Sequence, residues 1–179
     1  IYFENKELTK KDKKSLKWAI ENNIKIISQS FVENKRDIDH IRKYICEING
    51  DLKSIKLLSK IETNLGVDNF KEIIRYSDGI IIARGDLIPE CGLINSVDKE
   101  FDLLLKVKKY EKEKEVIIAT HILDNMRKGI IPNINELESI YTFVNLGVTG
   151  FLLASETSIG NYPVKSVEML KMLINLYKK

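Results

Sequence analysis

Residues 55–62 read IKLLSKIE, an apolar run that ends in a lysine and a glutamate. A short apolar run of this kind, bounded by polar residues, is typical of a buried strand. Lys60 and Glu62 lie two positions apart, and side chains at that spacing on a strand project to the same side. The stretch therefore predicts a strand whose carboxyl end presents an amine beside a carboxylate.

Four other apolar runs also stop on polar or small residues, at 24–30, 79–86, 116–120 and 150–157. They are short and rich in β-branched residues, which favours strands. We expect five strands, at residues 24–27, 55–59, 80–83, 116–119 and 149–153.

Stretches with the periodicity of amphipathic helices separate these runs. The first has Thr9 as a cap and Asp12 in the capping-box position. Pro89 and Gly92 predict a long irregular loop over 85–97, and such a loop in a compact domain is more often functional than idle. The expected helices are 9–22, 34 or 35 to 48, 66–76, 98–110, 121–128, 133–146 and a last helix that opens at Pro163.

The alternation of strands and helices predicts an α/β protein with a parallel sheet and right-handed crossovers. Such a sheet is either open and doubly wound or part of a closed barrel. All five predicted strands end in groups able to do chemistry, as they do in (β/α)8 barrels, which favours the barrel. We therefore expect residues 1–179 to form a single domain of five parallel strand-helix units, an incomplete TIM-barrel arc with two exposed sheet edges.

The 179 residues are 44% hydrophobic and 31% charged, with a net charge of +3. The lysines are mixed with nearly as many acidic residues, so we expect no nucleic-acid partner. No apolar run approaches the roughly 20 residues of a membrane-spanning helix, and two cysteines without metal-ligand spacing indicate a reducing compartment. We expect no membrane association and a cytoplasmic location. Because the chain starts at Ile1 rather than Met, we also expect it to be a piece of a longer product.

The candidate chemistry lies at the ends of two successive strands. Lys60 and Glu62 end one strand, and Arg84, Gly85 and Asp86 end the next. Two carboxylates with water and substrate oxygens can hold a divalent ion such as Mg²⁺, and a lysine beside that ion can stabilise developing negative charge. Gly85 allows a ligand to approach the backbone closely. The alternative for either stretch alone is an ion pair that braces the end of the sheet.

Several motifs together resemble the pyruvate kinase family, in order and at the spacings of that family over nearly the whole chain. A single such motif would be weak evidence, but four separate ones agree. They are SKIET at 59–63, DGIIIARGDL at 78–87, IAT at 118–120 with Met126, and LASET at 153–157 with GNYP at 160–163.

The resemblance implies phosphoryl transfer between phosphoenolpyruvate and ADP, which gives pyruvate and ATP, with Mg²⁺ or Mn²⁺ as cofactor. By position, Lys60 matches the lysine that stabilises the transferring phosphoryl group and the enolate, and Glu62 and Asp86 match the metal carboxylates. The amides of Gly85, Asp86 and Thr120 match those that bind the substrate carboxylate, and the Thr120 hydroxyl matches the group near the proton delivered to the enolate. K⁺ is a further cofactor of the family, but its ligands would not lie in this chain.

The chain departs from the pattern of the family at several places near the site. The stretches involved are Ile88-Pro89-Glu90, Thr120-His121, residues 132–136 (PNINE, without the arginine of the family), residues 138–142 (ESIYT) and Ala154-Ser155. Nothing in the chain matches the first three strands of the barrel, the lid domain or the C-terminal domain of the family. We therefore expect either a homo-oligomer or part of a larger chain.

Three hypotheses follow. The first is a catalytic segment of a pyruvate kinase. The second is an inactive pyruvate-kinase-like structural or interaction subunit, and the third is another metal-enolate enzyme, such as an aldolase that uses pyruvate. Lys60, Glu62 and Asp86 together favour an enzyme, whereas the altered residues on the nucleotide side argue against complete transfer by this chain alone.

Overall fold

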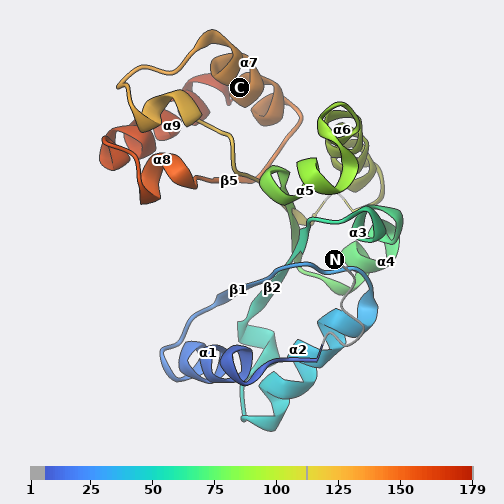
Figure 1. The fold of residues 1–179 in the computed structure, drawn as a ribbon. Coiled ribbons are helices and arrows are strands. Elements are labelled where there is room, and N and C mark those ends of the chain that lie inside the picture. The colour runs from blue at the N-terminus through green and yellow to red at the C-terminus, as the bar shows by residue number, and fades with distance from the viewer. Residues whose placement is uncertain (1–6, 112, 179) are drawn as a thin grey trace.

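The computed structural model describes residues 7–111 and 113–178, so the expected single domain 1–179 includes a few positions outside the described residues. Its strands form one parallel sheet in the order β1-β2-β3-β4-β5. Helices lie along the outer side of this curved sheet, from α1 and α2 at one end to α7 and α9 at the other, and the arc is open (Figure 1). The predicted α/β fold with five parallel strand-helix units of a TIM-barrel arc is confirmed. The strands are β1 (Ile26–Gln29), β2 (Lys56–Ile61), β3 (Gly79–Ala83), β4 (Glu115–Ala119) and β5 (Gly150–Leu152).

Capping groups fix the starts of several helices where the sequence places them. Thr9 and Asp12 form the predicted capping box of α1. Asn34 with Asp37 and Asn133 with Glu136 form the same motif at α2 and α7, and each box satisfies donors that a helix start otherwise leaves without partners. The helices are α1 (Lys10–Glu21), α2 (Lys35–Glu47), η1 (Leu52–Ser54), α3 (Asn64–Asp68), α4 (Phe70–Tyr76), α5 (Arg84–Cys91), α6 (Leu93–Tyr110), η2 (Asp124–Arg127), α7 (Ile134–Asn145), α8 (Ser155–Ser158) and α9 (Pro163–Tyr177).

The expectation of an irregular loop over 85–97 is wrong, because most of that stretch is helical. Helix α5 begins at Arg84, directly after β3, and contains Pro89. Gly92 has φ 79° and separates α5 from α6, which starts at Leu93. Of Pro89 and Gly92, the two residues from which the loop was predicted, only Gly92 interrupts the helix. Two smaller differences are that the predicted helix 66–76 is divided into α3 and α4, and that the predicted helix 121–128 is the short 3-10 turn η2.

The two faces of the sheet carry different sets of buried side chains. Alternate residues of β2, β3 and β4, among them Leu57, Ile80 and Ile118, belong to the main core beneath the helices. The opposite face carries a smaller buried cluster of Leu58, Ile81, Ala83 and Ala119. Every residue of β3 is buried, as its nearly pure isoleucine sequence predicts. Because side chains alternate along a strand, Lys60 lies on the same face as Leu58, which is the inner face of the arc.

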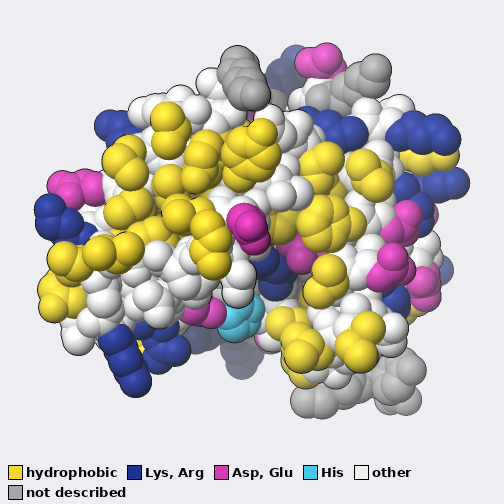
Figure 2. Space-filling view, turned by 90° about the horizontal axis from the view of Figure 1, so that it is seen from above, with side chains coloured by type: hydrophobic (Ala, Val, Ile, Leu, Met, Phe, Trp, Pro, Cys, Tyr) yellow, Lys and Arg dark blue, Asp and Glu magenta, His cyan; other side chains and the backbone are white. Residues whose placement is uncertain are grey.

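The outer surface is more apolar around the last helices. Hydrophobic side chains gather in a broad area on the face shown in Figure 2, on the side of the molecule where α7, α8 and α9 lie. None of the described helices has both the length and the apolar composition that a membrane crossing requires. Exposed apolar residues in and next to these helices are Ile130, Ile131, Ile134, Tyr141, Ile159, Val164, Val167, Met172 and Leu176.

Candidate active site

The end of β2 presents the amine and the carboxylate side by side, as the sequence predicts. Lys60 Nζ lies 2.6 Å from Glu62 Oε1 and donates a 3.1 Å hydrogen bond to Ser30 Oγ, which follows β1. The Lys60 side chain is 20% exposed and that of Glu62 is 1% exposed. A buried carboxylate is therefore covered by an amine that solvent and ligands can still reach.

The buried Glu62 carboxylate uses its two oxygens differently. Oε2 accepts a 2.6 Å hydrogen bond from the amide of Phe31. Oε1 accepts no hydrogen bond of good geometry from the described residues, and its close neighbour is the Lys60 amine. Phe31 has φ 54°, an uncommon conformation for a bulky residue that is often found at functional sites. Phe31 was not predicted as a site residue, because a bulky residue in a loop carries no sequence signal for such a conformation.

The first turn of α5 brings Gly85 and Asp86 to the same edge of the sheet. The Gly85 amide donates a 2.7 Å hydrogen bond to Thr120 Oγ1. The Thr120 amide donates a 3.2 Å hydrogen bond to the Leu152 carbonyl oxygen. Both amides therefore have partners within the chain, and binding a substrate carboxylate there would require exchanging these bonds. The Asp86 side chain is exposed and forms no hydrogen bond or ion pair with the described residues.

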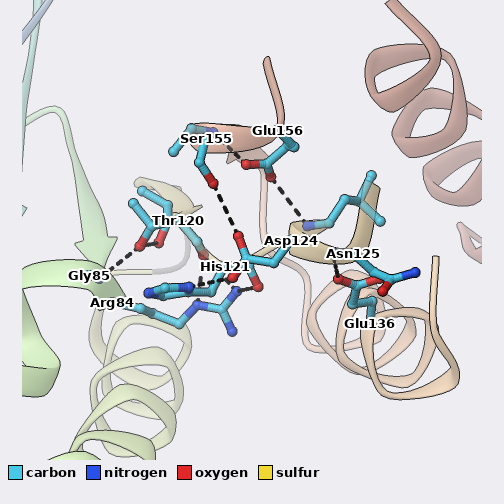
Figure 3. Close-up of polar contacts among 12 residues, drawn as sticks. Arg84, Gly85, Thr120, His121, Asp124, Asn125, Glu136, Ser155 and Glu156 are labelled. Atoms are coloured by element: carbon cyan, nitrogen blue, oxygen red, sulfur yellow. Dashed lines mark hydrogen bonds and ion pairs between the residues drawn. The ribbon is translucent and has the colours of Figure 1, made fainter. Parts of the chain in front are cut away.

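Arg84 holds the segment that follows β4. Its Nε and Nη2 donate to the Thr120 carbonyl oxygen at 3.1 and 2.7 Å, and Nη2 also donates to the His121 carbonyl oxygen at 2.5 Å. Thr120 and His121 have φ of 65° and 53°, so both residues are in the left-handed region that costs most residues energy. The guanidinium lies 5.5 Å from the centre of the Phe143 ring and 3.8 Å from Glu100 Oε1. Figure 3 shows Arg84 beneath Thr120 and His121.

A second polar group links the ends of β4 and β5. His121 Nδ1 lies 2.6 Å from Asp124 Oδ2, and Ser155 Oγ donates to Asp124 Oδ1 at 3.3 Å (Figure 3). His121 and Ser155 are both positions at which the chain departs from the pattern quoted above, and Asp124 joins them. The His121 side chain is half exposed.

The electrostatics of the Arg84 neighbourhood are dominated by burial. Burial lowers the pKa of Arg84, although the charges of Glu100, Asp124 and Glu156 oppose this. Burial raises the pKa of Glu100 to about 7, and the positive charge of Arg84 opposes that shift. The ion pair between them therefore lies in a region where charge is costly.

The groups present fit a hard divalent cation. Glu62 Oε1 is a buried carboxylate oxygen without a hydrogen bond, and Asp86 is a second carboxylate at the end of the next strand, without a partner among the described residues. No cluster of three or more His, Cys, Asp or Glu side chains suited to a metal occurs in the part of the chain that the structure describes. Mg²⁺ is commonly held by one or two carboxylates with water and substrate oxygens completing the shell, and the carboxylates of Glu62 and Asp86 are groups of that kind.

Charged groups at the carboxyl ends of consecutive parallel strands, around an open arc of strand-helix units, are the arrangement of TIM-barrel proteins, whose sites lie at that edge. Within that class, the profile described as "Pyruvate kinase, barrel domain" matches residues 3–167. The chain belongs to the pyruvate kinase family, as the motifs indicated.

Three curated relatives are each about a third identical to this chain over the aligned segment. The pyruvate kinase of Methanocaldococcus jannaschii is 36% identical over 159 residues, which are 89% of this chain and 34% of the relative. The pyruvate kinase of Chlamydia muridarum is 33% identical over 172 residues, 96% of this chain and 35% of the relative. Pyruvate kinase 2 of Saccharomyces cerevisiae is 35% identical over 163 residues, 91% of this chain and 31% of the relative. The chain therefore spans about a third of the length of these relatives.

Proposed function

We propose that this chain supplies the metal-binding and lysine-bearing part of a pyruvate kinase active site, which transfers a phosphoryl group between phosphoenolpyruvate and ADP. The observation that carries the proposal is the contact of 2.6 Å between Lys60 Nζ and the buried Glu62 Oε1 at the end of β2. A pair that only braced a sheet end would gain little from placing the carboxylate out of water with one oxygen lacking a hydrogen bond. A site for a cation and an anionic substrate needs both features.

Each residue has a role that its surroundings allow. Lys60 supplies positive charge to a phosphoryl group and an enolate oxygen that approach from the inner face of the arc. Fixed positive charge at the position where negative charge develops is a major source of catalysis in phosphoryl transfer. The Thr120 hydroxyl, which accepts from the Gly85 amide and donates to the Ala119 carbonyl oxygen, is the proposed group near the proton that is delivered to the enolate carbon.

Glu62 and Asp86 would hold Mg²⁺ or Mn²⁺, with substrate oxygens and water as the other ligands. When bound, the cation supplies charge neutralisation of the phosphoryl and carboxylate oxygens. The amides of Gly85, Asp86 and Thr120 are the proposed donors to the substrate carboxylate, and for Gly85 and Thr120 this binding replaces the internal bonds described above. K⁺, if used, would be bound by residues outside this chain.

The rest of the active site lies outside these residues, because the chain covers about a third of its relatives. We propose that the open edges at β1 and β5 join the remaining barrel strands, supplied by the same polypeptide or by another chain. The apolar residues Ile26 of β1 and Leu152 of β5 are 54% and 47% exposed, which supports a covering partner at both edges.

The experiment that tests the proposal is a lactate-dehydrogenase-coupled assay of pyruvate and ATP formation by the intact natural protein. We expect Lys60→Met to lower kcat by more than about a hundredfold. Lys56→Met is the matched control, since Lys56 lies on the same strand at its opposite end and pairs with Glu115, and it should leave kcat nearly unchanged. Equal activity of the Lys60→Met variant and the unsubstituted protein would refute the assignment. An inactive natural protein would instead favour the structural subunit or the pyruvate-using aldolase.

A further inference from the structure

Glu100 of α6 is a buried carboxylate that the proposed reaction does not use. The residue is 4% exposed, and its Oε1 accepts no hydrogen bond from the described residues. The nearest charge is the Arg84 guanidinium, whose Nε lies 3.8 Å from that oxygen. Glu100 Oε1 therefore points toward Arg84, and no hydrogen-bond donor among the described residues binds this oxygen.

A small cavity lies at the same place. It has a volume of about 120 Å³ and is lined by the polar side chains of Arg84, Glu100, Ser96 and His121 and by apolar side chains of α5 and α6. The side chains of Arg84 and Glu100 are 15% and 6% exposed, and charges that are largely removed from bulk water interact more strongly than charges in solvent. The charge of Glu100 therefore acts on Arg84 with less screening than it would have at the surface.

The stability of the fold does not explain why a carboxylate is kept there. Burial raises the pKa of Glu100 to about 7 even with Arg84 beside it, so the folded protein favours the neutral form more than water does. Buried ion pairs are frequently no more stabilising than apolar residues of similar volume. A buried carboxylate whose ionised form lowers the stability of the fold is a candidate for a functional role.

We propose that Glu100 is a positioning residue, whose negative charge fixes the Arg84 guanidinium against the carbonyl oxygens of Thr120 and His121 and so fixes the backbone of Thr120 beside Gly85. The geometry supports each link. Glu100 lies 3.8 Å from Arg84, Arg84 donates to both carbonyls, and Thr120 Oγ1 accepts from Gly85 at 2.7 Å. Two consecutive left-handed residues need such support, because each alone is disfavoured. The inference rests on the proposed function, since Thr120 is a catalytic residue only within it.

The other charged groups near Arg84 are already bound elsewhere or face solvent. Asp124 binds His121 Nδ1, and Glu156 accepts a hydrogen bond from the Leu123 amide. Both attract Arg84 over a longer range, and among the described residues Glu100 is the carboxylate within ion-pair distance of the guanidinium. His121, which lines the same cavity, is the remaining titratable group that faces it.

The test compares Glu100→Gln with the unsubstituted intact protein at pH 6 and pH 8, and Glu136→Gln is the matched control. Glu136 is also buried, but it caps α7 by accepting from the amides of Asn125 and Asn133. Hydrogen–deuterium exchange of peptides that cover 84–87 and 119–123, corrected for intrinsic rates, reports the position of Thr120 whether or not the protein is active. The coupled assay gives kcat and the KM for phosphoenolpyruvate.

We expect Glu100→Gln to accelerate exchange in both peptides about tenfold at pH 8 and to lower kcat by about tenfold or more, with KM changed less than about twofold. At pH 6 both differences should shrink, because Glu100 of the unsubstituted protein is then largely protonated. Glu136→Gln should change neither quantity. Glu100→Met, which is uncharged and of similar volume, should reproduce the result and decides the matter if the glutamine variant does not fold.

Unchanged exchange in both Glu100 variants would overturn the inference. A loss of kcat that is equal at pH 6 and pH 8 would overturn it too, because a purely structural role does not depend on the charge of Glu100. If the unsubstituted protein is inactive, the proposed function fails, and the exchange data alone then decide the inference: a pH-dependent acceleration supports it and its absence overturns it.

Discussion

The amide of Gly85 and the hydroxyl of Thr120 meet at 2.7 Å, so the first turn of α5 is joined to the end of β4 by one hydrogen bond. The same hydroxyl donates to the Ala119 carbonyl oxygen, and the Thr120 carbonyl accepts from Arg84. Thr120 is therefore fixed through both its backbone and its side chain. The site at this edge of the sheet depends on how closely two elements far apart in sequence approach each other.

Gly85→Ala tests that approach. A Cβ at position 85 would lie 3.3 Å from Thr120 Oγ1, a tight contact, whereas a Cβ at Gly129 would meet its nearest atom at an ordinary 3.6 Å. We expect Gly85→Ala to lower kcat/KM for phosphoenolpyruvate about tenfold or more, because a small displacement of a reacting group is costly. Gly129→Ala should change it less than about twofold. A Gly85→Ala enzyme with normal kcat/KM would show that the contact has room to relax.

Thr120→Val removes the hydroxyl and keeps the shape of the side chain. The Gly85 amide then lacks its partner, at a cost of about 1–3 kcal/mol if water does not replace it. We expect the coupled assay to show kcat reduced by about a hundredfold, and Thr120→Ser to restore most of it. Thr142→Val is the control, because the Thr142 hydroxyl donates within its own helix to the Glu138 carbonyl. A serine variant as slow as the valine variant would contradict a role for the hydroxyl.

The strand ends were predictable from the sequence because they follow a local rule. The pleat of a strand places Lys60 and Glu62 on one side, and the 2.6 Å contact agrees with that expectation. The parallel arrangement of the strands was predictable from the alternation of strands and helices. The capping box of Thr9 and Asp12 was predictable from a pattern of four consecutive residues. Each of these features depends on neighbours within a few residues or on the period of a regular element.

The features that escaped prediction depend on tertiary contacts. The Phe31 amide reaches Glu62 across 31 positions, and Glu100 acts on Arg84 from another helix. The helical path of α5 was missed because Pro89 was interpreted as a break, although the helix continues through it to Cys91. The left-handed conformations of Thr120 and His121 have no sequence signal, since neither residue is glycine. Long-range contacts that override local preference are expected to be concentrated at functional sites.

Glu62→Gln tests the carboxylate pair without requiring catalysis. Replacing the buried carboxylate by an amide keeps the hydrogen bond from Phe31 but removes the charge that a divalent cation needs. We expect the dissociation constant of Mn²⁺, measured by electron paramagnetic resonance on the intact protein, to rise more than about tenfold. Glu115→Gln is the control, as Glu115 pairs with Lys56 at the other end of the sheet. If Glu62→Gln and Glu115→Gln bind Mn²⁺ equally well, Glu62 is not a ligand.

The pH dependence of stability gives a test of Glu100 that is independent of any reaction. The pKa of Glu100 is raised by burial from its ordinary value of 4.5 to about 7 in the folded protein. Between these two pH values Glu100 binds a proton more readily in the folded state than in the unfolded state. The stability that protonation of Glu100 contributes is therefore fully present below pH 4.5. That contribution is lost as the pH rises through 7. The shift corresponds to roughly 3 kcal/mol between pH 4.5 and pH 8.

A glutamine at position 100 has no proton to lose over this range, so Glu100→Gln should remove that part of the pH dependence. In urea unfolding of the intact protein, we expect the free energy of unfolding of the variant, relative to that of the unsubstituted protein, to increase by about 2 kcal/mol from pH 5 to pH 8, which means that the variant is relatively more stable at pH 8. Glu136→Gln should show no such trend. If Glu100→Gln is more stable at pH 8 and also has a lower kcat at that pH, the charge of Glu100 serves the position of Thr120 and not the stability of the fold. If the free energies of unfolding of Glu100→Gln and the unsubstituted protein change in parallel with pH, Glu100 titrates normally.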